Sequence, residues 1–147
     1  MQIIYEQDEF IRDWLHDRLG YEISEGVTIA LAREGHLEAV ACFHEYRQEH
    51  GSIELTFATK SPKWQSRRYI RAIFGYAFGQ LGCGRITTFA PAVNSMATRL
   101  NDRIGFVREG IMRKAFYGGD LVMFGMLRDE CKWLRHGKKQ AESTTAS

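Results

Sequence analysis

The chain has 147 residues, enough for one domain, and its 44% hydrophobic and 26% charged residues are typical of a soluble globular protein. No stretch approaches the ~18 consecutive apolar residues of a membrane span, and the N-terminus lacks the basic-then-apolar layout of a signal peptide. Cys42, Cys83 and Cys131 form no CxxC pair, which argues against a disulfide framework or a zinc finger and indicates free thiols. We therefore expect a cytoplasmic protein.

The net charge of +2 is unevenly divided along the chain. Residues 1–54 carry twelve acidic against four basic side chains, a net of −8. Residues 55–108 carry nine basic side chains against the single acid Asp102, a net of +8, and residues 109–147 carry seven against five, a net of +2. The basic middle third indicates an anionic ligand there.

In the first half of the chain, residues 2–5 predict a short strand and residues 7–18 a helix. The apolar residues of this helix recur with helical spacing: Phe10, Ile11, Trp14, Leu15 and Leu19. Strand-like runs follow at 27–32, 37–43 and 53–59. The first two predict an antiparallel hairpin, and the alternation in the third predicts a half-buried strand.

In the second half, an amphipathic helix is predicted over 65–81, because its apolar residues form one stripe. These are Ile70, Ile73, Phe74, Ala77, Phe78 and Leu81. A strand follows at 85–90, then a short helix N-capped by Asn94. Residues 106–116 and 121–127 predict a final hairpin.

This order of strands and helices predicts a single α+β (mixed α/β) domain over residues 1–136. Residues 137–147 are polar and show no apolar period, so we expect a disordered C-terminal tail.

The start of helix 65–81 is unusually basic, with Lys63, Arg67, Arg68 and Arg71. Helix starts carry unpaired N–H groups and a partial positive charge, which disfavour basic side chains. A bound phosphate or pyrophosphate would be held by the N–H groups and the arginines together. The alternative is a solvated basic face whose arginine stems cover apolar surface.

Three motifs in chain order resemble the GNAT superfamily of acyl-CoA-dependent N-acyltransferases, over roughly residues 3–134. They are Gln65-Ser66-Arg67-Arg68-Tyr69-Ile70, Asn94-x-x-Ala97-x-x-Leu100 and Gly105-Phe106-x-x-Glu109-Gly110-x-x-Arg113. The last hairpin, with Gly119-Asp120, Met123 and Met126, resembles the ribosomal-protein N-terminal acetyltransferase branch, and small phage and prophage members look similar. The resemblance implies a mostly antiparallel twisted sheet flanked by helices, acetyl-CoA as co-substrate, a primary amine acceptor and no metal.

The family's pyrophosphate loop runs Gln/Arg-x-x-Gly-x-Gly/Ala, and the chain departs from it. Gln65 fits, but Arg68 and Ile70 replace glycines that let a backbone approach phosphate closely. Side-chain contacts from Arg67 and Arg68 would have to compensate. The resemblance implies cofactor contacts from the loop, the preceding strand and the following helix: Ala58, Thr59, Lys60, Gln65, Ser66, Arg67, Arg68, Tyr69, Ile70, Asn94 and Asn101.

The family's chemistry is direct attack of an amine on the thioester, which needs a base, an oxyanion donor and an acid. Glu54 is our candidate base, and its alternative is a surface glutamate. A β-bulge in strand 53–59 would aim an N–H at the thioester oxygen. Asn101 stands where the family usually has a tyrosine acid, and an amide cannot donate a proton as an acid. Tyr117 is the substitute candidate, and otherwise water protonates the thiolate.

Two other functions stay open, a GNAT-fold protein that binds CoA without catalysis and a nucleic-acid-binding module that uses residues 60–108. The second is disfavoured because no RNP-like or helix-turn-helix signature is present and the bases gather at one helix start. We hypothesise that the acidic first third, including Glu22 and Glu25, attracts a cationic amine. We also expect that the C-terminal strands could form a homodimer.

Overall fold

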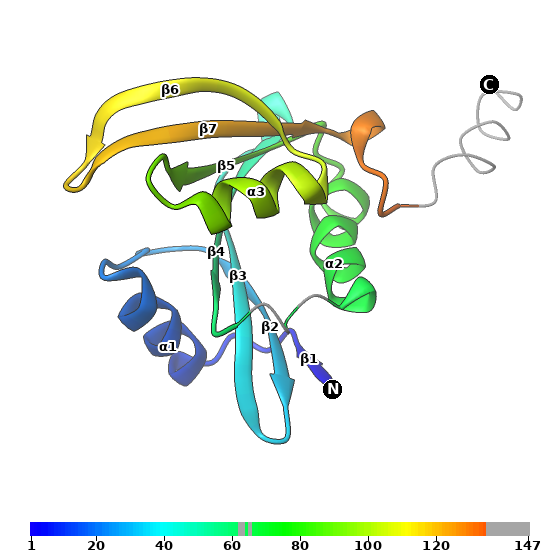
Figure 1. Ribbon diagram of the computed structural model, residues 1–147. Coiled ribbons are helices and arrows are strands. Elements are labelled where there is room, and N and C mark those ends of the chain that lie inside the picture. Colours follow the sequence, from blue (N-terminus) through cyan, green and yellow to red (C-terminus); the bar gives the residue numbers. More distant parts are fainter. Residues whose placement is uncertain (62–63, 65, 135–147) are drawn as a thin grey trace, which may run out of the picture.

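The computed structural model describes residues 1–61, 64 and 66–134 (Figure 1). Within them one seven-stranded sheet has the order β1-β2-β3-β4-β5-β7-β6. The strands are β1 (Gln2–Ile4), β2 (Val27–Arg33), β3 (His36–Arg47), β4 (Ser52–Thr59), β5 (Arg85–Pro91), β6 (Val107–Phe116) and β7 (Gly119–Leu127). Neighbouring strands are antiparallel except β4 and β5, which are parallel. The predicted mixed α/β architecture is confirmed.

Three helices accompany the sheet: α1 (Glu9–Leu19), α2 (Arg67–Phe74) and α3 (Ser95–Ile104). A π-helical segment, Gly75–Gln80, continues α2. Short 3-10 turns cover Gln48–His50 and Arg128–Glu130.

Helix starts are set by side-chain caps, which place them slightly later than the apolar pattern predicted. The Asp8 carboxylate accepts the N–H of Phe10 at 2.8 Å, so α1 begins after Asp8. The Ser66 hydroxyl accepts the N–H of Tyr69 at 3.3 Å, so α2 begins after Ser66. The predicted cap of α3 is confirmed, because the Asn94 side chain accepts the N–H of Ala97 at 3.1 Å.

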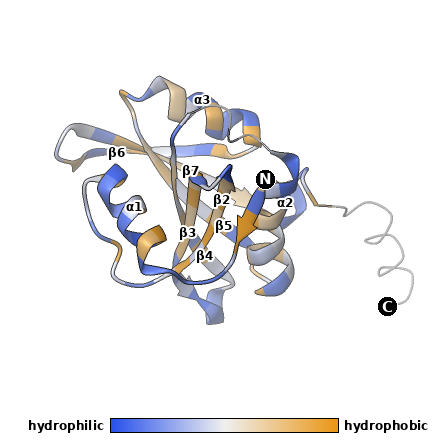
Figure 2. Ribbon diagram, turned by 90° about the horizontal axis from the view of Figure 1, so that it is seen from below, coloured by the Kyte–Doolittle hydropathy of each residue, from blue (hydrophilic) through white to orange (hydrophobic). Residues whose placement is uncertain are grey.

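The helices cover opposite faces of the sheet. Ile11 and Leu15 of α1 pack on one face, against a small cluster that includes Val40, Cys42 and Ala58. The larger core lies on the other face, under α2 and α3, and contains the whole predicted stripe of α2, with Leu81 partly buried. Figure 2 shows hydrophobic colour on the central strands between these layers. Phe10 was expected in the α1 stripe, but its side chain is 67% exposed because it does not point toward the sheet, as Ile11 and Leu15 do.

The sheet splits between β4 and β5. These strands pair only at Ser52–Arg85, Ile53–Ile86 and Glu54–Thr87. Beyond Glu54, β4 stays with β3 while β5 stays with β7, so one edge of β4 is free of β5.

The bulge expected in β4 is not found there. β4 pairs with β3 in continuous register from Glu54 to Thr59. The irregularity lies in β3 between His44 and Arg47, where Glu45 takes the left-handed conformation with φ of 52°. A residue in that conformation accommodates the extra position of a bulge, so the distortion falls on the strand next to the split.

β6 and β7 form a long hairpin at the far edge of the sheet (Figure 1). The Arg85 guanidinium binds both carboxylate oxygens of Glu109. That carboxylate lies over Gly125, where an added Cβ would collide with it. This ion pair ties β6 to β5 across β7. No helix in the described part of the chain is long and apolar enough to cross a membrane.

Candidate active site

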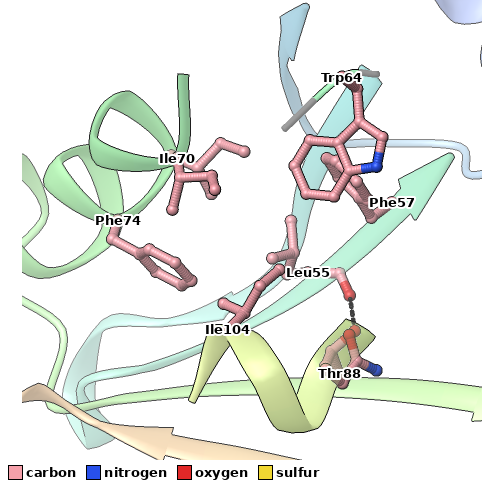
Figure 3. Close-up of a pocket in the computed structure, with 9 residues that line it drawn as sticks. Leu55, Phe57, Trp64, Ile70, Phe74, Thr88 and Ile104 are labelled. Atoms are coloured by element: carbon pink, nitrogen blue, oxygen red, sulfur yellow. Dashed lines mark hydrogen bonds between the residues drawn. The ribbon is translucent and has the colours of Figure 1, made fainter. Parts of the chain in front are cut away.

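An apolar pocket lies over the split, between α2 and α3 (Figure 3). Its walls come from β4, the residue Trp64, α2, β5 and α3, and include Leu55, Phe57 and Phe74. The ring of Trp64 packs edge-on against Phe57, with centroids 4.6 Å apart. Only about 30 Å³ inside is open to water-sized molecules, roughly the volume of one water.

The backbone of β4 turns alternate residues toward the split. The Thr88 hydroxyl donates to the Leu55 carbonyl at 2.8 Å, across the opening (Figure 3). The Arg18 guanidinium donates to the Thr59 carbonyl at 3.2 and 3.0 Å. Since N–H and C=O of one residue in a strand point the same way, Leu55, Phe57 and Thr59 face the split.

The neighbouring residues of β4 face β3 instead. Ala58 pairs with Val40 of β3, and the Lys60 N–H donates to the Glu38 carbonyl at 2.8 Å. Of the three predicted pantetheine contacts, only Thr59 therefore turns its backbone to the split. Phe57, which sequence reasoning did not select, supplies a backbone N–H there.

Of the arginines of the predicted anion site, Arg67 and Arg68 lie at the start of α2, while Arg71 lies in its last turn. Arg67, Arg68 and Arg71 are exposed, and none forms an ion pair with a described residue. Two other arginines of the basic third are paired, Arg85 with Glu109 and Arg108 with Asp102. Gln65 and Lys63 lie outside the described residues.

Tyr69 and Ile70 belong to the core. Tyr69 is fully buried, and its hydroxyl donates to the Ile29 carbonyl at 2.7 Å, while burial raises its pKa. Ile70 lines the pocket. Ser66 contributes as the helix cap, so these side chains position the helix start.

The two asparagines differ in their surroundings. Asn101 lines the pocket, next to Ile104. Asn94 is exposed and caps α3.

Tyr117 and Glu54 lie on different parts of the molecule. Tyr117 is fully exposed in the turn between β6 and β7, at the end of the hairpin, and lines neither the pocket nor the split (Figure 1). Glu54 lies at the last paired position of β4, opposite Thr87 of β5.

On the face that carries α1, the residues next to the split are polar although α1 itself packs on apolar residues, and sequence reasoning missed the main contact among these polar residues. His44 Nε2 lies 2.7 Å from Thr56 Oγ1. Glu54 is the cross-strand partner of His44, and Thr56 that of Cys42. Burial lowers the pKa of His44, while the charges of Glu54 and Glu45 oppose that shift. The alternation along the two predicted strands could have indicated that His44, Glu54 and Thr56 lie on one face of the sheet. It could not have indicated which of them are in contact, because that depends on the register between the strands.

Among the described residues, no group of three or more His, Cys, Asp and Glu side chains could hold a metal ion. The arrangement offers instead a strand edge that is not paired with β5 beyond Glu54, an apolar pocket on one side and ionisable side chains on the other.

No model of a known protein family matches the chain. Individual relatives do. The uncharacterized SPbeta prophage-derived N-acetyltransferase YokL of Bacillus subtilis is 26% identical over 136 residues, which are 86% of this chain and 74% of YokL. YdaF of the same organism, whose name proposes a ribosomal N-acetyltransferase, is 26% identical over 132 residues, 84% of this chain and 70% of YdaF.

Solved structures share the fold. A variant of the spermidine N-acetyltransferase SpeG of Vibrio cholerae superposes with a TM-score of 0.73 at 18% identity, over 94% of this chain and 100% of that chain. SpeG in complex with CoA and spermine superposes with a TM-score of 0.70 at 17% identity, over 88% of this chain and 96% of that chain. In sequence the chain is similar to N-acetyltransferases, and it shares the fold of GNAT acetyltransferases such as SpeG.

Proposed function

We propose that this protein transfers the acetyl group of acetyl-CoA to the primary amine of a small cationic acceptor by direct attack. The observation that carries the proposal is the split between β4 and β5, which has a free strand edge, an apolar pocket and a basic helix start within one short stretch of chain. A non-catalytic CoA-binding protein would need the pocket and the basic helix start but not the polar face beyond them.

The cofactor would lie on the α2 and α3 side. Its phosphates would meet the first N–H groups of α2, which helix geometry leaves unpaired, together with the Arg67 and Arg68 side chains. Arginine forks suit phosphate oxygens, which supports side-chain contacts in place of the missing glycines. Because the pocket holds about one water, Trp64 or its neighbours would shift to admit the pantetheine arm.

The chemistry would take place on the edge of β4. The amine nitrogen bonds to the thioester carbon, the carbon–sulfur bond breaks, and CoA leaves as thiolate. The Phe57 N–H, which faces the split, is positioned as a donor to the oxyanion. Glu54 lies on the opposite, acceptor side, where an amine must give up a proton.

The acceptor side favours a cation. Glu22 and Glu25 are exposed on the loop between α1 and β2, and Gly26 at the end of that loop lies against β3 beside His44. These acids and Glu54 would attract an amine with more than one positive charge. SpeG, which shares the fold, is named for acetylating spermidine, so spermidine is a first compound to test.

Acetyl transfer is tested with thermal shift and thiol release. Acetyl-CoA should raise Tm, and a panel of primary amines including spermidine should release free CoA thiol. Replacing Arg67 and Arg68 with Ala should weaken acetyl-CoA binding by at least about 100-fold, since each charge-assisted contact contributes about 1.5–3 kcal/mol. Arg128→Ala, an exposed arginine outside α2, is the matched control.

Three outcomes decide between the candidate functions. No shift at millimolar acetyl-CoA would contradict cofactor binding. A shift without thiol release from any amine would favour the non-catalytic alternative. Tight nucleic-acid binding that weakens steeply with salt would favour the nucleic-acid module.

We also propose a homodimer through the C-terminal strands. β6 is exposed along nearly its whole length and carries the exposed apolar side chains Ile111 and Met112. Long exposed edge strands are prone to pair with another chain. Light scattering should give twice the chain mass, and Ile111→Asp should return it to the monomer value; a monomeric wild-type protein would contradict the dimer.

A further inference from the structure

The polar face of the split is organised around Thr56. β4 and β5 are still joined at Glu54–Thr87, and Thr56 is the next residue on the same face, beyond that last pair. Its side chain therefore lies where the strands have separated. Glu54, by contrast, lies where they are still hydrogen-bonded neighbours.

Thr56 is in contact with His44. His44 Nε2 and Thr56 Oγ1 are 2.7 Å apart, a strong hydrogen-bond distance for a hydroxyl and an imidazole. The imidazole is half-buried, and the contact is diagonal across the β3–β4 pair, because the direct partner of His44 is Glu54.

The backbone around His44 fixes the position of its side chain. The bulge of β3 begins directly after it, with Glu45 in the left-handed conformation. On the other side, Gly26 lies so close that an added Cβ would stand 3.3 Å from the His44 Cβ and 2.7 Å from the Phe43 carbonyl oxygen. Bulges and strained residues concentrate beside functional sites.

We propose that Thr56 and His44 form the proton relay of the acetyl transfer, in which the Thr56 hydroxyl takes the proton of the attacking amine and passes its own proton to His44 Nε2. The relay rests on the proposed function. As the amine nitrogen bonds to the thioester carbon, its proton moves to Thr56 Oγ1, and the carbon–sulfur electron pair leaves with the CoA thiolate. His44 ends as imidazolium and returns its proton to solvent after the products leave.

The charges around His44 suit both states of the relay. Burial lowers its pKa and keeps the ring neutral before reaction, while Glu54 from β4 and Glu45 from β3 stabilise the imidazolium. From the loop after α1, Tyr21 interacts electrostatically with Cys42 of this face, and Glu25 precedes Gly26, which lies beside His44.

Two cations on neighbouring elements are engaged with other groups. Arg12 of α1 donates to the carbonyls of Gly26 and Ile23, and Arg85 of β5 is paired with Glu109. Glu54 thus acts in this scheme as the charge partner of His44, and the proton itself goes to the imidazole.

Kinetics with the amine that the wild-type protein acetylates provide the first test. His44→Gln and Thr56→Val should each lower kcat about 100-fold or more, the usual range for a lost acid–base group, with the KM for acetyl-CoA unchanged. Thr56→Ser keeps the hydroxyl and should stay within several-fold of wild type. His36→Gln, an exposed histidine at the start of the same strand, is the matched control.

The pH profile separates the relay from a structural role. Wild-type kcat/KM should fall on the acid side with an apparent pKa below the ordinary histidine value, and this limb should disappear in His44→Gln. If Glu54→Gln removes the limb and His44→Gln retains it at the wild-type rate, Glu54 is the base and the relay is wrong.

Nitrogen-15 NMR of the free protein tests the geometry without an acceptor, with the His44 signal assigned by its loss in His44→Gln. At pH 7.5 the hydrogen should reside on Nδ1, leaving Nε2 to accept from Thr56, and Thr56→Val should raise the pKa of His44. A hydrogen on Nε2 overturns the relay even in an active enzyme. Failure of the wild-type protein to acetylate any amine overturns the proposed function and, with it, the relay.

Discussion

The two faces of the split between β4 and β5 have opposite chemistry, although they are built from the same strands. Toward α2 and α3, Leu55 and Phe57 meet a large apolar core. Toward α1, Glu54 and Thr56 of the same strand meet His44. One strand with strict alternation therefore separates an apolar side, where we propose that the cofactor lies, from a side with ionisable groups, where we propose that the acceptor lies.

This contrast predicts that changes on the apolar face act on stability at any pH, while changes on the polar face act on turnover and on how stability depends on pH. The largest stability effect is expected from Phe74→Ala. Phe74 is 2% exposed, lines the pocket and packs on Phe78 and Phe106. Its loss should lower the free energy of unfolding by about 3–5 kcal/mol, measured by urea denaturation.

Phe10→Ala, at a 67% exposed phenylalanine of α1, is the control for Phe74. It should change the free energy of unfolding by no more than about 0.5 kcal/mol. If Phe74→Ala and Phe10→Ala lowered the free energy of unfolding equally, the larger core would not lie on the α2 face.

The hydroxyl of Thr88 joins the two strands across the opening. Thr88→Val should lower the free energy of unfolding by about 1–3 kcal/mol, because the buried carbonyl of Leu55 would lose its donor. Thr88→Ser keeps that donor and should retain most of the stability. An unchanged urea midpoint in Thr88→Val would show that the bridge does not stabilise the split.

On the polar face, His44 should make stability depend on pH. Because its pKa is lowered in the folded protein, the unfolded chain binds a proton more readily as the pH falls through the ordinary histidine range. Stability should therefore be full above that range and decline on acidification through the lowered pKa.

His44→Gln should flatten this decline between pH 7.5 and 5, measured as the difference in urea midpoint. His36→Gln, at an exposed position, should leave it unchanged. If stability still declines on acidification in His44→Gln, a group other than His44 is responsible for the pH dependence.

The smallest effect is expected at the exposed ion pair that ties β6 to β5. Arg85 lowers the pKa of Glu109, so its contribution is present at neutral pH and is lost as the pH falls through the lowered pKa. Both side chains are about one-third exposed. Glu109→Gln should therefore cost about 1 kcal/mol or less at pH 7, and nothing at low pH; a larger loss would mean that the hairpin depends on this pair.

Much of the architecture follows from patterns within single segments. The alternation of 53–59, the stripe of α2 and the Asn94 cap were predicted correctly, because periodicity and capping depend on neighbours a few residues apart. The order of strands and helices, together with three short motifs, was enough to indicate the family.

The placement of the site required the tertiary structure. Which of Ala58, Thr59 and Lys60 turns its backbone to the split depends on the register with β3, and register is set by strands distant in sequence. Tyr117 is adjacent to the motifs in the chain, yet the length of the hairpin carries it away from the pocket.

The sequence by itself determined the elements, their order and the basic start of α2, since local spacing and composition specify these features. The tertiary structure alone decided that β4 and β5 separate after Glu54 and that His44 meets Thr56. The physical reason is that each contact joins strands through a register that no single segment encodes. The acidic first third of the chain contributes Glu45 and Glu54 next to His44, while the basic third contributes Arg67 and Arg68 at the start of α2, on the face under which the larger core lies.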